Sequence, residues 1–160
     1  MKSLLKKFSS KGFTLIELLI VIAILGVLAA GILVAIDPID KINAANDAKV
    51  QNDVSNIGKA GEAYSIVQAG SFTLTAAELV TYGELKRLPV PPAAGYGIAY
   101  AYTALPGGCT TAAKTCTSIT ITSPLLSKKY SAAAANTPFW RYESSSGKSC
   151  AVATAATPCP

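Results

Sequence analysis

The chain has 160 residues, a formal net charge of +5 and no histidine. This length accommodates one membrane helix and one modest globular head, but no second large domain. Four of the 14 basic residues lie in the first twelve positions, so residues 13–160 carry ten basic and nine acidic side chains. This near balance predicts that residues 13–160 as a whole do not form a strongly basic surface.

A long apolar segment follows the basic head of the chain. Leu18 to Ile36 are nineteen consecutive residues without a charge, and a helix of that length rises roughly 28 Å, close to the roughly 30 Å of a bilayer's hydrocarbon core. The lysines before this segment predict a cytoplasmic amino terminus and export of everything after about Asp37. Glu17 lies inside the apolar stretch, where a carboxylate costs about 2.5 to 3.5 kcal/mol at the bilayer centre and therefore needs a partner.

Three interpretations of this segment compete. Glu17 fits the first turns of a helix, where the macrodipole favours a negative charge by about 0.3 to 1 kcal/mol. An ordinary secretory signal would instead be cut near residues 27–30, although an acidic residue within the apolar run argues against it. In the third interpretation, a basic leader is removed between Gly12 and Phe13, and the apolar helix stays on the mature protein.

Residues 11–21, KGFTLIELLIV, favour the third interpretation because they resemble the class III leader junction of type IV pilins and type II secretion pseudopilins. The resemblance is close over roughly residues 6–38. It implies that a prepilin peptidase cleaves after Gly12 and methylates the new amino-terminal Phe13. The chain would then consist of a leader over 1–12, a transmembrane and assembly helix over 13–37, and an exported part over 38–160.

The exported part begins with a second helical pattern. We expect a kink or a brief unwinding at Asp37 and Pro38, because proline lacks the N–H group that continues a helix. Apolar residues then recur mostly three or four positions apart, which predicts an amphipathic helix that stops at Gly70. Thr75 to Glu78 has the form of a capping box for a short helix. Strand-like segments rich in tyrosine, isoleucine and threonine occupy residues 97–103, 117–122, 139–143 and 150–154.

The predicted fold class is α+β. A long amino-terminal helix, half transmembrane and half amphipathic, packs on a small antiparallel β-sheet of three or four strands, because each needs a partner for its apolar face. The resemblance implies the same pilin-like architecture. The first two strands flank Gly107, Gly108 and Cys109, which predicts a hairpin.

Four cysteines lie in the last third of the chain, at Cys109, Cys116, Cys150 and Cys159. An even number of cysteines in an oxidising compartment predicts two disulfides. Of the three connectivities we favour the two local ones, Cys109 with Cys116 and Cys150 with Cys159. A metal site is the weaker alternative, because the spacings are not those of paired zinc knuckles and the chain has no histidine.

No enzyme and no cofactor are expected. After Glu84 the only carboxylate side chain is Glu143, so neither an acid–base pair nor an activated nucleophile can be assembled in the head. Cations and aromatic residues do mix near the carboxy terminus, at Lys128, Lys129, Tyr130, Trp140, Arg141, Tyr142 and Lys148. Such a set is compatible with DNA binding or adhesion, but we expect the more common arrangement, core aromatic residues beside solvated charges.

The sequence therefore predicts a structural subunit of a type IV pilus-like or type II secretion filament, anchored once in the inner membrane and then part of an extracellular or periplasmic filament. The resemblance implies identical copies, prepilin peptidase, the inner-membrane assembly machinery and membrane lipid as partners. It also implies that Glu17 meets the amino-terminal nitrogen of Phe13 on a neighbouring subunit. Major pseudopilins often carry a calcium site of acidic residues, and its lack here favours a pilin over a pseudopilin. The alternative is a singly anchored or secreted binding module that does not polymerise.

Overall fold

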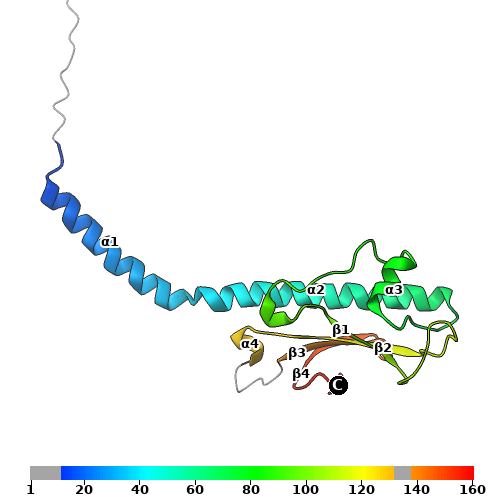
Figure 1. The fold of residues 1–160 in the computed structure, drawn as a ribbon. Coiled ribbons are helices and arrows are strands. Elements are labelled where there is room, and N and C mark those ends of the chain that lie inside the picture. The colour runs from blue at the N-terminus through cyan, green and yellow to red at the C-terminus, as the bar shows by residue number, and fades with distance from the viewer. Residues whose placement is uncertain (1–11, 132–137) are drawn as a thin grey trace, which may run out of the picture. The chain divides into compact units, whose positions relative to one another are not determined.

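A computed structural model describes residues 12–131 and 138–160 (Figure 1). The chain divides into two compact units, one ending at Pro38 and one running from Ile39 to Pro160. The lysines of the proposed leader lie outside the described residues.

The described part of the first unit is formed mainly by helix α1, over Leu15–Ile36. None of its residues is buried. Asp37 ends the helix in the left-handed conformation, with φ 46° and ψ 72°, which aspartate tolerates better than most residues other than glycine. The helical pattern is therefore interrupted at a single residue, and a second helix begins at Pro38.

The second unit is built on α2, a 30-residue helix over Pro38–Val67. Proline is tolerated at its first position because the N–H groups of the first turn have no acceptor within the helix. The buried positions recur at helical spacing, at Asp47, Val50, Val54, Ile57, Gly58, Ala60, Gly61, Tyr64 and Ser65. Ala69 and Gly70 then adopt positive φ angles, and Gly70 N donates a hydrogen bond to Ser65 O at 2.8 Å. This geometry ends the helix just before the predicted stop.

Four antiparallel strands form a meander in the order β1-β2-β3-β4. They span Ala101–Leu105 (β1), Ser118–Pro124 (β2), Phe139–Glu143 (β3) and Lys148–Val152 (β4). Helix α2 lies along the sheet (Figure 1). Ile119 and Ile121 of β2 and Tyr142 of β3 are buried in one core cluster with the apolar stripe of α2. The predicted α+β fold, including the hairpin of the first two strands, is confirmed.

Two of the four predicted strands are displaced along the chain. The strand predicted over 97–103 begins only at Ala101, because a 3-10 helix, η1, occupies Ala94–Tyr96 and Gly97 follows it with a φ of 85°. The strand predicted over 150–154 occupies 148–152, because the turn that ends at Gly147, with a φ of 64°, places Lys148 opposite Glu143.

The short helix α3 spans Ala76–Thr81, but the capping box predicted for it is absent. The Thr75 side chain makes no cap hydrogen bond. Glu78 Oε2 instead accepts hydrogen bonds from Leu74 N at 3.1 Å and from Thr111 Oγ1 at 2.7 Å. The carboxylate therefore ties α3 to the loop between β1 and β2, a long-range contact that the local sequence does not specify.

Two disulfides close the head, Cys109–Cys116 and Cys150–Cys159. They are the two local pairings favoured from the sequence. The first closes the loop between β1 and β2, and both of its cysteines are buried. The second ties the carboxy-terminal segment to β4 through Cys150. Arg141 of the neighbouring β3 pairs with Glu143 and also donates to the carbonyl of Ala155 in that segment.

Gly58 allows Tyr142 of β3 to approach α2. A Cβ at Gly58 would lie 2.5 to 2.7 Å from three ring carbons of Tyr142, and the ring is held by a 2.9 Å hydrogen bond from its hydroxyl to Glu62 Oε1. We expect Gly58→Ala to lower the free energy of unfolding by about 1 to 3 kcal/mol through overpacking. Gly61→Ala is the matched control, because its Cβ would approach only the terminal methyl of Ile119 closely. Denaturant unfolding should show a smaller loss of unfolding free energy for Gly61→Ala than for Gly58→Ala. Equal losses would contradict the explanation by overpacking against Tyr142.

Candidate processing and assembly site

The predicted cleavage junction lies at the exposed start of α1. Phe13 is 87% exposed, and both Gly12 and Phe13 precede the helix in non-helical conformation. Apart from its chain neighbours, no described atom lies within 4 Å of the position that a Cβ on Gly12 would occupy. The described chain itself therefore places no steric demand on Gly12, and a requirement for glycine would have to come from an enzyme that reads this junction.

Thr14 and Glu17 form a reciprocal capping box at the start of α1. Glu17 N donates to Thr14 Oγ1 at 3.3 Å, while Glu17 Oε2 accepts from Thr14 N at 2.8 Å and from Thr14 Oγ1 at 2.7 Å. This box satisfies backbone donors that the first turn leaves without partners. The role of Thr14 was not predicted, although threonine three positions before glutamate at the head of an apolar run is its sequence signal.

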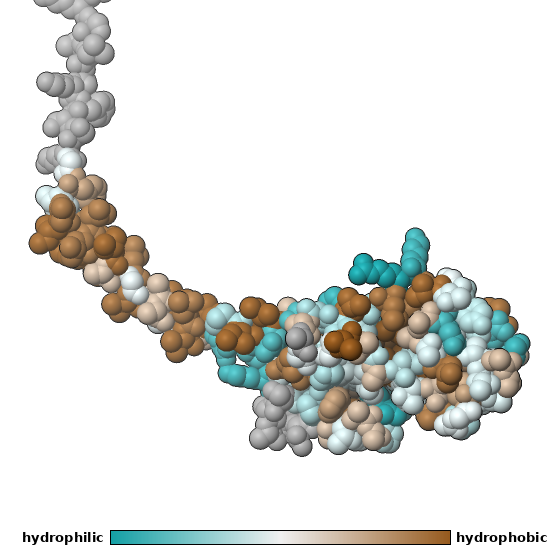
Figure 2. Space-filling model, in the orientation of Figure 1, coloured by the Kyte–Doolittle hydropathy of each residue, from teal (hydrophilic) through white to brown (hydrophobic). Residues whose placement is uncertain are grey.

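No residue of α1 is buried, and Figure 2 shows apolar side chains along the visible face of this helix. Among its large apolar side chains, even the least exposed, Val21, is 48% exposed, and Val34 is 86% exposed. The helix is long and apolar enough to cross a membrane. Soluble monomers rarely expose an apolar surface of this extent, so lipid or other protein chains must cover it.

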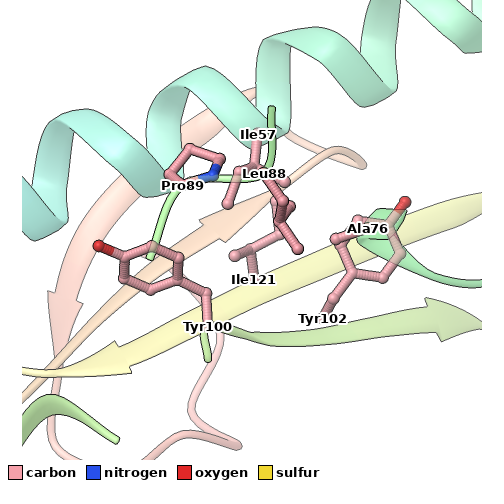
Figure 3. A pocket seen from close by; sticks show the side chains of 7 residues that line it. All are labelled: Ile57, Ala76, Leu88, Pro89, Tyr100, Tyr102 and Ile121. Carbon is pink, nitrogen blue, oxygen red and sulfur yellow. The ribbon is translucent and has the colours of Figure 1, made fainter. Parts of the chain in front are cut away.

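The head contains a small apolar pocket between α2 and the sheet (Figure 3). It is lined by Ile57, Ala76, Leu88, Pro89, Tyr100, Tyr102 and Ile121. Its two hydroxyl groups are already engaged, that of Tyr100 with Asp53 Oδ2 at 2.6 Å and that of Tyr102 with Thr73 Oγ1 at 2.7 Å. The pocket therefore presents no charged group or nucleophile, and we interpret it as a packing gap in the core. Within 12–131 and 138–160, no three histidine, cysteine or acidic side chains gather as a metal site.

Buried tyrosines hold the head together through carboxylates on α2. The hydroxyl of Tyr96 donates to Asp47 Oδ1 at 2.6 Å, and that of Tyr142 donates to Glu62 Oε1. Burial, followed by the hydrogen bond and the charge of the acceptor, raises the pKa of both tyrosines above its ordinary value. Burial likewise raises the pKa of Tyr102 to about 12. The folded head therefore holds these phenolic protons more tightly than the unfolded chain does.

These raised pKa values predict an alkaline limit of stability. The tyrosine contribution should be fully present below the unfolded pKa of about 10 and should be lost as the pH rises toward 12, because the native state then binds more protons than the unfolded state. Denaturant unfolding between about pH 8 and 12 should show this decline, and Tyr142→Phe should make it shallower. An unfolding free energy that is the same at both ends of the range would contradict the prediction.

The cation and aromatic residues near the carboxy terminus do not form one exposed patch. Tyr142 is buried, Trp140 packs against the core cluster, and Arg141 pairs with Glu143 beneath the carboxy-terminal segment. Lys128 and Lys129 are exposed at α4 (Lys128–Ser131). Trp140, Arg141 and Tyr142 therefore lie against the core or are paired, and a binding role for the predicted set stays a prediction.

Comparison with known proteins bears on the amino-terminal segment. Residues 7–33 match the family model of the prokaryotic N-terminal methylation motif, which is the class III prepilin leader of type IV pilins and pseudopilins. The match confirms the resemblance and contains Gly12, Phe13, Thr14 and Glu17. No curated protein and no solved structure matches the chain.

Proposed function

We propose that this chain, which carries the prokaryotic N-terminal methylation motif, is a structural subunit of a type IV pilus-like or type II secretion filament. The observation that carries the proposal is the place of the motif, at the head of an apolar helix whose residues are all exposed. Prepilin peptidase cleaves the precursor between Gly12 and Phe13 and methylates Phe13. The retained α1 then anchors the subunit and later joins the filament.

In this proposal the apolar surface of α1 is covered first by lipid and later by the helices of other subunits. In the precursor it spans the inner membrane once, with the lysine-rich leader in the cytoplasm and the head outside. During assembly the helix exchanges lipid for the helices of sister subunits, which offer an equally apolar surface and closer packing. The assembly machinery of the inner membrane extracts each subunit for this step.

Glu17 aligns each incoming subunit in this proposal. Within the described residues, its carboxylate accepts hydrogen bonds through Oε2 only, from Thr14. Oε1 is left for the charged amino nitrogen of Phe13 on a sister subunit. An ion pair of this kind in apolar surroundings is costly to leave unmade, so a subunit in the wrong register is disfavoured.

Replacing Gly12 with tryptophan should leave an uncut precursor. The described chain has room for a side chain at this position, so folding and membrane insertion should be unchanged and only recognition by the peptidase should fail. Amino-terminal sequencing should find Phe13, methylated, in the wild-type product and Met1 in the variant. Normal processing of the variant would contradict the assigned junction.

The same sequencing tests the other candidate, a secreted binding module. A wild-type product that begins near Ala30 would lack most of α1 and would rule out a filament built on it. A compact head with its own core and two disulfides favours this candidate as the runner-up.

A further inference from the structure

The face of the sheet that points away from α2, here called the outer face, carries a covered ion pair. Tyr142 of β3 is buried in the core cluster with α2, and side chains alternate along a strand, so Arg141 and Glu143 point to the outer face. Their side chains are nevertheless only 11% and 9% exposed. Val152 of β4 lies opposite Phe139 on the same face and is 3% exposed. The outer face is therefore covered in this region rather than open to solvent.

The carboxy-terminal segment, residues 153–160, contacts the outer face. Figure 1 shows the end of the chain on the side of the sheet opposite α2. Arg141 Nη1 donates a hydrogen bond to Ala155 O, and Lys148 Nζ donates to Pro160 O at 3.0 Å. Both hydrogen bonds are exposed, so water competes for their donors and acceptors and their net contribution is small. These two bonds alone hold the segment weakly.

The covalent tie of this segment is the more accessible of the two disulfides. Cys150 and Cys159 are both partly exposed, whereas Cys109 and Cys116 are both buried. A disulfide is opened by a thiolate that attacks one of its sulfur atoms, so the rate depends on access to the sulfur. A reductant in solution should therefore reach the Cys150–Cys159 bond first.

We infer that the Cys150–Cys159 disulfide is a redox-sensitive tie, which a dithiol reductant opens while the other disulfide stays closed. Without this bond the carboxy-terminal segment leaves the outer face, and Arg141 and Glu143 become accessible to solvent and to ligands. The core between α2 and the opposite face of the sheet remains in place, because neither cysteine of the tie belongs to it.

The reaction is an ordinary thiol–disulfide exchange. A thiolate of the reductant attacks one sulfur of the Cys150–Cys159 bond, forms a mixed disulfide and releases the other cysteine as a thiolate, which takes up a proton. The second thiol of the reductant then displaces the first cysteine. The reductant is oxidised to its disulfide and loses two electrons, while Cys150 and Cys159 are reduced to thiols.

The test uses the full chain in a non-ionic detergent, so it can fail independently of filament formation. Dithiothreitol is added to the folded protein, free thiols are trapped with iodoacetamide at successive times, and the peptides are identified by mass spectrometry. We expect Cys150 and Cys159 to be labelled at least about tenfold faster than Cys109 and Cys116, because a thiolate reaches their sulfur atoms more readily. Equal rates for the two pairs would overturn the inference.

The two arginines of the chain report whether the segment leaves the outer face. Arg87 is exposed, whereas Arg141 is covered. Phenylglyoxal modifies guanidinium groups that solvent can reach. After selective reduction its rate of reaction at Arg141 should rise at least about fivefold, because the local structure that protects the side chain has opened. The rate at Arg87 should stay the same. An unchanged rate at Arg141 in protein whose Cys150 and Cys159 are reduced would overturn the inference.

Two variants separate the disulfide from the hydrogen bonds. The double substitution Cys150→Ser and Cys159→Ser should make Arg141 reactive without any reductant. Lys148→Gln is the matched control, because it removes the charged donor to Pro160 O and leaves the disulfide in place; Arg141 should stay protected in it. A protected Arg141 in the double variant, or one that is equally reactive in Lys148→Gln, would show that the disulfide is not the tie.

Discussion

Replacing Glu17 with alanine is expected to abolish filaments while leaving cleavage and membrane insertion intact. The substitution removes the only acidic side chain of α1, so insertion into lipid becomes easier and the junction at Gly12 is unchanged. During assembly, the amino nitrogen of Phe13 on the sister subunit then lacks the Glu17 carboxylate with which it is proposed to pair. Breaking one side of a buried ion pair costs about 3 to 5 kcal/mol, which corresponds to a loss of more than about a hundredfold in assembly.

Two further variants show whether the charge is what matters. Glu17→Gln keeps an oxygen that can accept from Thr14 but loses the charge, so it should also fail to form filaments. Leu18→Ala changes the neighbouring side chain without touching the capping box and should assemble. Filament yield by electron microscopy and precursor processing by immunoblot are the two measurements. Wild-type yield from Glu17→Ala or Glu17→Gln would remove the proposed role of the carboxylate.

Replacing Asp47 with alanine should cause the largest loss of stability in the head. Its side chain is 1% exposed and accepts three hydrogen bonds, from Tyr96 Oη at 2.6 Å, Leu126 N at 2.9 Å and Ser127 N at 3.0 Å. The substitution leaves the backbone N–H groups of Leu126 and Ser127 without an acceptor, and each costs about 1 to 3 kcal/mol. The Tyr96 hydroxyl keeps Asn43 O as an acceptor at 3.0 Å. We expect the free energy of unfolding to fall by about 3 to 5 kcal/mol, a large part of the roughly 5 to 15 kcal/mol typical of a domain.

Asp47→Asn is the conservative comparison, because one oxygen remains to accept while the other becomes a donor. Asp47→Asn should lower the free energy of unfolding by less than Asp47→Ala does. Asp53→Ala is the control on the same helix, because its side chain is partly exposed and its loss should be about 1 kcal/mol. Denaturant unfolding of the full chain in detergent gives all three values. If Asp47→Ala lowers the free energy of unfolding no more than Asp53→Ala does, the buried Asp47 carboxylate does not hold α2 to the segment before α4.

The parts of the molecule that the sequence predicted well depend on local patterns. The charge-free run from Leu18 to Ile36 predicts α1, and spacing at three and four residues predicts α2. Asp37 and Pro38 mark the place where one helix ends and the next begins. The two disulfides join cysteines seven and nine positions apart, so proximity along the chain was enough to favour them.

The features that escaped prediction depend on tertiary contacts. Thr75 and Glu78 have the sequence of a capping box. The Glu78 carboxylate instead accepts a hydrogen bond from Thr111, which lies in the loop between β1 and β2. The inward positions of Trp140 and Tyr142 follow from the register of β3 against its neighbours.

A reconstruction of the filament by electron microscopy tests the central claim most directly. The account predicts that α1 lies in the interior, surrounded by the same helix from sister subunits. It also predicts that Glu17 Oε1 lies within hydrogen-bond distance of the amino nitrogen of Phe13 on one of those subunits. A filament in which α1 is absent or faces solvent, or in which Glu17 contacts only its own Thr14, would contradict it.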